Sequence, residues 1–213
     1  MVQLQGKILT DTWVKASWAE YLAIVESPEY EKAKCYYAQG RLRIEMSPLG
    51  NDHASDHLTI IQAISLFTAV NNIRLNGKDN CSYRKTGFKE VQPDVSYYIG
   101  KNAKAIPRGT KIIDLDQYPA PNLVIEIGDT SIRDDQGEKR LIYEDLGVEE
   151  YWIVDVQNSS IIALAMKNNG REKITESRLL PGLKINILTT ALQKSRTSDH
   201  GEIGAWLISE FQK

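Results

Sequence analysis

Two acidic residues and one lysine occupy positions from which they could form a catalytic site. Asp94 follows Pro93, and a proline is tolerated at the start or edge of a strand, so Asp94 is expected near an exposed end of a sheet. Glu126 lies in the apolar run 123–127, where a carboxylate must be paired, desolvated or bound to a metal. Lys139 follows on the next predicted helix.

These residue types together favour phosphodiester hydrolysis. Two carboxylates on neighbouring strands make a hard, oxygen-lined site, which Mg²⁺ prefers while it keeps waters and binds substrate phosphate oxygens; Mn²⁺ is the alternative ion. A bound metal lowers the pKa of a coordinated water and offsets charge in the transition state. We therefore predict that Asp94 and Glu126 are metal ligands and that Lys139 assists the attacking water or the scissile phosphate.

The elements that must position these residues alternate between helical and strand periodicity. The order predicts an α/β fold, a mixed β-sheet flanked by α-helices, in a domain over 1–193. A polar linker and an amphipathic helix are expected over 194–213. Asp52 is the expected N-cap of the second helix. The predicted helices are 12–27, 52–71, 133–146 and 202–212; the predicted strands are 41–47, pieces of 81–98, 123–127, 151–156, 161–166 and 184–188; turns or loops are expected at 48–51, 77–80 and 100–121.

Several short motifs occur in a fixed order between residues 13 and 188. They are Met46-Ser47-Pro48-Leu49-Gly50 with His53, Pro93-Asp94, Glu126, Asp135-Gln136-Gly137-Glu138-Lys139 with Tyr143, and Gly147-Val148-Glu149-Glu150-Tyr151-Trp152-Ile153-Val154-Asp155. This pattern resembles the Uma2 (DUF820) family, common in cyanobacteria and similar to PD-(D/E)xK restriction-endonuclease-like nucleases. The last motif is the most specific part of the resemblance.

The resemblance implies an endonuclease in which Asp94 and Glu126 bind Mg²⁺, Lys139 is the catalytic lysine and His53 has an auxiliary role. DNA is favoured over RNA as the substrate. One position departs from the broad nuclease pattern, because Gly128 stands where a lysine usually follows the second acid by two residues. The alternative function is therefore a binding or interaction module that kept the nuclease fold and lost the chemistry.

The remaining candidate site residues have structural interpretations beside the functional ones. Lys139 could instead form an i,i+4 ion pair with Asp135 on a solvated helix face. Tyr143 is expected mainly in the core, although it could line the site. His53 and His57 are one helical turn apart, as in some zinc sites, but the only other histidine, His200, lies in the polar tail, so zinc is the weakest alternative.

Composition sets the remaining expectations. The net charge is -2 and the pI is near 6.0, which argues against tight non-specific binding of nucleic acid but allows a local basic groove. Cys35 and Cys81 form no metal or disulfide motif, and no apolar run is long enough to span a membrane, so a cytoplasmic protein is expected. A homodimer through the Trp206 face of the last helix is a further expectation. Glu149 and Glu150 are expected at the surface or at an interface, and Trp152 is expected in the core. The cations considered for contact with a nucleic-acid backbone are Lys101, Lys104, Arg108, Lys111, Arg133 and Arg140.

Overall fold

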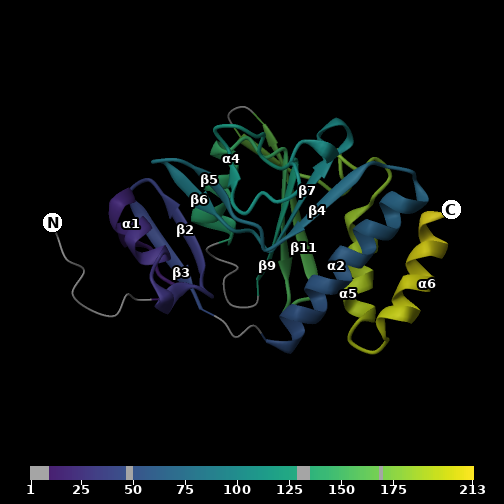
Figure 1. Cartoon of the computed structure of the whole chain (residues 1–213). Coiled ribbons are helices and arrows are strands. Elements are labelled where there is room, and N and C mark those ends of the chain that lie inside the picture. The colour runs from purple at the N-terminus through teal and green to yellow at the C-terminus, as the bar shows by residue number, and fades with distance from the viewer. Residues whose placement is uncertain (1–9, 47–49, 129–134, 168–169) are drawn as a thin grey trace. The chain divides into compact units, whose positions relative to one another are not determined.

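The chain folds into two compact units, each built on its own six-stranded sheet (Figure 1). The computed structural model describes residues 10–46, 50–128, 135–167 and 170–213. The first unit comprises Met1–Pro48, Ser82–Gln92 and Lys111–Gln117, and the second comprises Leu49–Cys81, Pro93–Thr110 and Tyr118–Lys213. The predicted α/β class is confirmed, with two mixed sheets in place of the single sheet expected.

The first unit is a small mixed sheet with one helix. Its strand order is β1-β3-β2-β6-β5-β8, in which only β5 and β8 pair in parallel. Helix α1 starts later than predicted because Ser17 caps it: its hydroxyl accepts from the Glu20 N–H, and the Glu20 carboxylate accepts from the Ser17 N–H. The elements are β1 (Val14–Lys15), α1 (Trp18–Val25), η1 (Pro28–Tyr30), β2 (Lys34–Ala38), β3 (Arg41–Glu45), β5 (Tyr83–Lys85), β6 (Lys89–Val91) and β8 (Ile113–Asp114).

The second unit contains all the predicted catalytic residues. Its sheet has the strand order β12-β11-β10-β9-β7-β4, and only the central pair β9 and β10 is parallel. A crossover from β9 to β10 carries a π-helical turn, η3, followed by α4. The elements are α2 (Asn51–Val70), β4 (Leu75–Asp79), β7 (Val95–Ile99), η2 (Gly100–Lys104), β9 (Leu123–Gly128), η3 (Asp135–Lys139), α4 (Arg140–Asp145), β10 (Glu150–Asp155), β11 (Ser160–Lys167), β12 (Gly170–Lys173), α5 (Ile185–Lys194) and α6 (His200–Phe211).

One face of this sheet forms the main hydrophobic core with α2, α5 and α6 (Figure 1). Alternate residues of the strands point into it, including Val95, Ile125 and Trp152, so the predicted core position of Trp152 is confirmed. The opposite face therefore carries the residues between them, Asp94 and Glu126 among them. Among the described helices, none has the length and apolarity needed to cross a membrane.

Three local predictions are wrong for identifiable reasons. Residues 77–80, predicted as a loop, lie largely in β4, where Gly77 lets the Tyr97 ring pack closely: a Cβ there would lie 3.0 Å from that ring. Residues 184–188, predicted as a strand, begin α5, whose buried residues continue with helical spacing beyond that short window. The N-cap of α2 is Gly50, so Asp52 lies inside the first turn. Of the turn predicted at 48–51, residues 48 and 49 lie outside the described residues, and Asn51 begins α2.

The predicted surface position of Glu150 is also wrong. Glu150 is 1 % exposed, and its carboxylate accepts four hydrogen bonds. The donors are Trp152 Nε1 at 3.0 Å, Ser177 Oγ at 3.0 Å, and the backbone N–H groups of Arg178 at 2.6 Å and Leu179 at 3.0 Å. Glu150 thus joins the start of β10 to the turn at 177–179.

The C-terminal segment packs onto the second unit. The polar stretch between α5 and α6 contains Arg196, which donates two hydrogen bonds of 2.8 and 2.7 Å to the fully buried carboxylate of Asp56 on α2. In α6, Ile203 and Leu207 are buried in the core, and Trp206 packs partly buried against it. The helix face considered for a dimer thus contacts the chain's own core, and the homodimer and the boundary near residue 193 stay predictions.

Candidate active site

The two predicted metal ligands lie on neighbouring antiparallel strands. Strands β7 and β9 pair Val95 with Ile125 and Ser96 with Val124. Extending this register by one residue places Asp94 opposite Glu126, and directly opposite residues have side chains on the same face of a sheet. Asp94 is 3 % and Glu126 1 % exposed, so Asp94, which was expected near an exposed end of the sheet, is itself buried.

Asp94 is held by the backbone of β9 and approached by a histidine of α2. Its Oδ2 atom accepts a hydrogen bond of 2.7 Å from the Ile127 N–H, and His53 Nε2 lies 3.9 Å from the same atom. His53 is also buried, and its Nδ1 atom has no hydrogen-bond partner among the described residues. The Nε2 atom of His53 thus lies near Asp94, whereas its buried Nδ1 atom makes no hydrogen bond with a described residue.

Glu126 contacts two residues of the crossover. The Tyr143 hydroxyl donates a 2.6 Å hydrogen bond to Oε1, and Lys139 Nζ lies 3.8 Å from Oε2. Lys139 is only 2 % exposed, so the solvated-face interpretation of this lysine is wrong. The structure therefore brings Asp94, Glu126, Lys139 and His53 together at one end of the sheet.

The π-helical turn explains how a lysine far along the chain reaches the strand carboxylate. Lys139 is the last residue of η3, and α4 begins at the next position. A π-turn adds a residue to the helical repeat, which changes where the following side chains point, and such turns are frequent at functional sites. The side chain of Asp135 lies outside the described residues, so its predicted ion pair with Lys139 stays a prediction.

Tyr143 has both of the roles considered for it. Its ring packs against that of Tyr151, with centroids 5.2 Å apart, and its hydroxyl reaches Glu126. Burial, together with the negative charge of Glu126, raises the pKa of Tyr143 well above its ordinary value, so the hydroxyl stays protonated as a donor. Sequence spacing placed Tyr143 one turn beyond Lys139, but the hydrogen bond required the tertiary fold.

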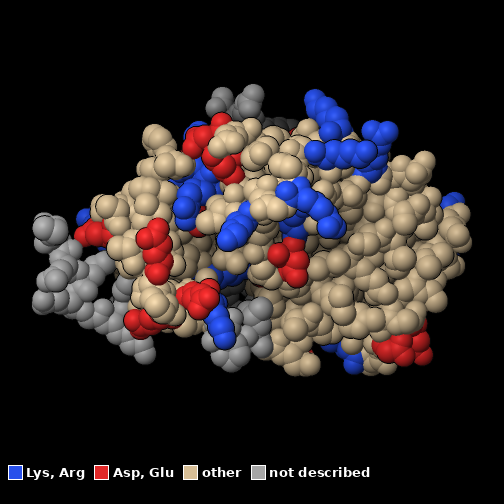
Figure 2. All heavy atoms as spheres, in the orientation of Figure 1, with Lys and Arg blue, Asp and Glu red and all other residues tan. Residues whose placement is uncertain are grey.

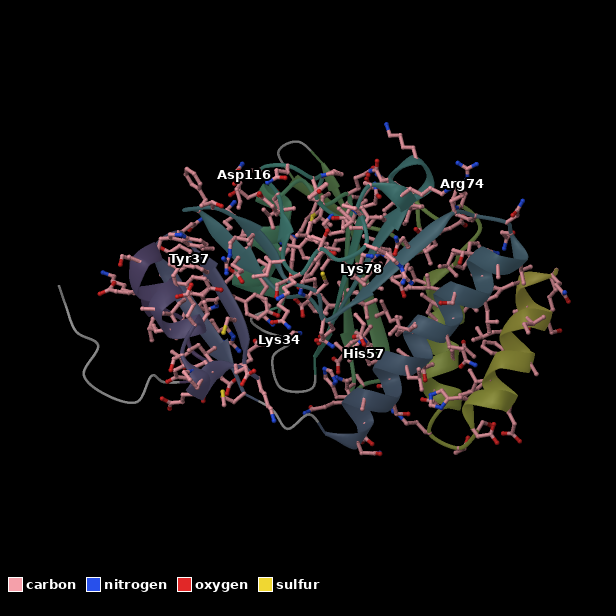
Figure 3. All side chains as sticks on the ribbon, viewed as in Figure 1. Lys34, Tyr37, His57, Arg74, Lys78 and Asp116 are labelled. Carbon is pink, nitrogen blue, oxygen red and sulfur yellow. The ribbon has the colours of Figure 1, made fainter. Side chains whose placement is uncertain are left out.

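A second histidine, His57, lies beside the site and contacts an aspartate. The Nε2 atom of His57, which is labelled in Figure 3, lies 3.3 Å from Asp79 Oδ1 at the end of β4. The His53 and His57 rings are nearly perpendicular, with centroids 6.1 Å apart. His200 is elsewhere, with Nε2 3.3 Å from Thr59 Oγ1. Within the described parts of the chain, no three His, Cys, Asp or Glu side chains are grouped as metal ligands, which gives the zinc alternative no support.

The donor set fits a hard divalent cation better than zinc. Two buried carboxylates on one face supply oxygen ligands, and Mg²⁺ characteristically completes such a set with waters and substrate phosphate oxygens. Zinc would need three or four protein ligands, typically including histidine or cysteine. Asp94 and Glu126 are therefore the residues that would hold a metal here.

Two cations considered for nucleic-acid contact are not available on the described surface. Arg140 is 8 % exposed, and its Nη1 donates a 2.6 Å hydrogen bond to Glu144. Arg133 lies outside the described residues. Lys101, Lys104, Arg108 and Lys111 are exposed, as expected for residues that could reach a phosphate.

Comparison with known proteins agrees with this architecture. The sequence model of the Uma2 family, described as "Putative restriction endonuclease", matches residues 18–199. A crystal structure described as that of a putative nuclease belonging to DUF820 from Anabaena variabilis is similar, with a TM-score of 0.55 and 17 % identity. The match covers 83 % of this chain and 98 % of that one. At this identity the likeness shows the fold. No curated protein matches the chain.

Proposed function

Because the chain belongs to the Uma2 family, as its motifs predicted, we propose that it is a Mg²⁺-dependent endonuclease that hydrolyses phosphodiester bonds in nucleic acid, with DNA as the preferred substrate. The observation that carries the proposal is the pair of buried carboxylates, Asp94 and Glu126, placed opposite each other with a buried lysine 3.8 Å from one of them.

Burial makes a purely structural role for this pair costly. Like charges directly opposite each other on neighbouring strands destabilise a sheet, and buried carboxylates lose hydration that partners restore only in part. Two apolar side chains packed at these two positions would stabilise the fold more than two carboxylates do. Buried groups with such electrostatic neighbours are therefore candidates for chemistry.

Each site residue has a distinct role in the proposed reaction. Asp94 and Glu126 would hold the metal, which supplies a coordinated water of lowered pKa and positive charge for the transition state. Lys139 stabilises negative charge on the scissile phosphate or orients the attacking water. Tyr143 fixes Glu126 through Oε1, leaving Oε2 on the side of Lys139. His53, whose Nε2 atom lies 3.9 Å from Asp94 Oδ2, has an auxiliary role beside the metal or the phosphate.

Metal titration tests the proposal. Calorimetry with Mg²⁺ and Mn²⁺ is expected to show binding to the wild type and none to Asp94→Asn. Asp79→Asn is the control, because Asp79 ends the neighbouring strand, is an aspartate of equal charge and has a side chain 65 % exposed. Cleavage of plasmid, single-stranded DNA and RNA, assayed in parallel, should follow metal binding. If the wild type neither binds metal nor cleaves, the binding-module alternative replaces the nuclease.

Tyr143→Phe tests whether the hydrogen bond from Tyr143 to Glu126 contributes to metal binding. The substitution removes one hydroxyl and keeps the ring against Tyr151, and loss of a hydrogen bond that orients a metal ligand typically costs about 10–100-fold in metal affinity. Calorimetry should therefore show weaker Mg²⁺ binding. Tyr151→Phe, which also removes a hydroxyl from a buried ring, should bind Mg²⁺ as the wild type does. Equal affinities in both variants would show that Tyr143 serves packing alone.

A further inference from the structure

Strand β4 and the short helix η2 form one exposed edge of the second unit. Strand β4 is the last strand of its sheet, and it pairs only with β7 among the described strands. Two hydrogen bonds join this part of the chain to η2: the Gly100 N–H donates to the carbonyl of Arg74, the residue before β4, at 2.9 Å, and Asn76 Nδ2 in β4 donates to the Ala103 carbonyl at 3.0 Å. The two elements thus present their side chains on a shared surface.

This surface carries four cations, which we call the basic edge: Arg74, Lys78, Lys101 and Lys104. Arg74, Lys101 and Lys104 are exposed, and Lys78 is half-buried, with its Nζ donating a 3.0 Å hydrogen bond to Asn76 Oδ1. The only acid within β4 and η2 is Asp79, which is paired with His57. Lys and Arg side chains gather over this part of the molecule in Figure 2, although the whole chain has a net charge of -2.

The basic edge leads to the carboxylate pair. Just beyond β4, the Asn80 N–H donates a 2.9 Å hydrogen bond to the carbonyl of Asp94, so this end of the strand lies beside the site. Lys78 is the register partner of Ser96, and strand alternation places Ser96 on the same face as Asp94. Ser96 is the second residue after Asp94, which corresponds to about 7 Å along an extended chain.

We propose that the basic edge binds the sugar-phosphate backbone of the nucleic-acid substrate and guides one strand to Asp94 and Glu126; this inference rests on the proposed nuclease function. Lys78 lies in β4 and Arg74 directly precedes this strand. Four residues of extended chain span about 13 Å, close to the rise of four nucleotides at about 3.4 Å each. Contacts to phosphates of this kind position a substrate without reading its sequence.

The salt dependence of binding tests the proposal apart from cleavage. All variants carry Glu126→Gln, and anisotropy of a labelled duplex and of a labelled single strand is measured over a series of NaCl concentrations. Removing one phosphate-binding cation reduces the steepness of log K against log salt by about 0.9 for duplex DNA, so Arg74→Gln with Lys78→Gln should reduce it by about 1.8. Lys101→Gln with Lys104→Gln should act similarly. Thermal melting checks that each variant is folded.

The opposite edge of the same sheet offers a matched control. Strand β12 carries two exposed cations, Arg171 and Lys173, at the far end of the strand order. Arg171→Gln with Lys173→Gln removes the same charge and should leave the slope unchanged. Equal slopes for the Arg74/Lys78 and Arg171/Lys173 double variants would overturn the proposal, as would a failure of the Glu126→Gln protein to bind either nucleic acid at low salt.

The two proposals fail in distinguishable ways. If nucleic-acid binding depends on the basic edge but the wild type binds no metal and cleaves no nucleic acid, the basic edge is retained and the nuclease is rejected. If the wild type cleaves nucleic acid with metal, but replacing Arg74 and Lys78 changes neither the affinity for nucleic acid nor the slope of log K against log salt, the nuclease is retained and the basic edge is rejected.

Discussion

Replacing Glu126 by glutamine is expected to lower cleavage by about 10³-fold or more while the protein stays folded. Glutamine keeps the shape and can still accept the hydrogen bond from Tyr143. It removes one of two anionic metal ligands, a loss of several kcal/mol in transition-state stabilisation, and each 1.36 kcal/mol is worth about tenfold in rate. Initial rates at saturating Mg²⁺ and the midpoint of urea unfolding provide the two measurements.

The stability of this variant separates a functional carboxylate from a structural ion pair. Breaking a buried structural pair typically costs about 3–5 kcal/mol. For a catalytic group we expect a change within about 1 kcal/mol, because active sites are arranged for chemistry at some expense of stability. Glu149→Gln, an isosteric change at an exposed position, is the control for both measurements. A Glu126→Gln protein that cleaves as the wild type does would remove Glu126 from the proposed metal site. A loss of several kcal/mol in stability would show that its buried contact with Lys139 also holds the fold.

The largest effect on stability is expected at Glu150. In Glu150→Gln the new amide must face two of the four donors, because each carboxylate oxygen accepts two hydrogen bonds. Glutamine has only one acceptor oxygen, so its amide nitrogen faces either the two backbone N–H groups, which both lose their acceptor, or Trp152 Nε1 and the Ser177 hydroxyl. In the second orientation the hydroxyl can turn and accept from the amide, and Trp152 Nε1 alone loses its acceptor. An unsatisfied buried donor costs about 1–3 kcal/mol, so the free energy of unfolding should fall by about 1–3 kcal/mol if one donor is left without an acceptor and by about 2–6 kcal/mol if two are.

Urea unfolding of Glu150→Gln beside Glu149→Gln measures this directly. The two positions are adjacent, but only Glu150 is buried, so the control should change stability by less than about 1 kcal/mol. Metal affinity should be the same in both folded variants, because the four donors to Glu150 lie in β10 and the turn at 177–179, away from Asp94 and Glu126 in the chain. Equal stability of the two variants would mean that the turn at 177–179 adapts to the amide without loss.

The parts of the fold that the sequence predicts are those with a long periodic pattern or a continuous apolar run. The strands with Glu126 and Trp152 are apolar runs that are buried along almost their whole length, and the helix with His53 is long enough for its buried residues to recur with helical spacing. Strand β4 has no such pattern: it is an edge strand with a glycine, and its residues resemble those of a turn. Helix α5 begins with Ile185 and Leu188, whose spacing over a few residues is ambiguous between helix and strand.

The same distinction applies to the site, where some residues can be recognised from the local sequence and some contacts form only in the tertiary fold. Asp94 and Glu126 could be predicted because a carboxylate stands out beside a proline or inside an apolar strand. The contact of Lys139 with Glu126 could be expected only from the family pattern, because it joins the crossover to β9 and is made in the tertiary fold. The approach of Asp79 to His57 depends on the position of β4, which was predicted as a loop.

The position of β4 at the edge of its sheet has a consequence for how copies of the chain behave in concentrated solution. An exposed edge strand offers unpaired backbone groups to any other strand, and natural proteins commonly discourage such pairing with lysines and other charges. Arg74 and Lys78 place positive charge along that edge, so two copies approaching edge to edge would repel each other. The same cations that we propose hold a polyanion would thereby protect the chain from aggregating through its own sheet, until a nucleic acid neutralises them.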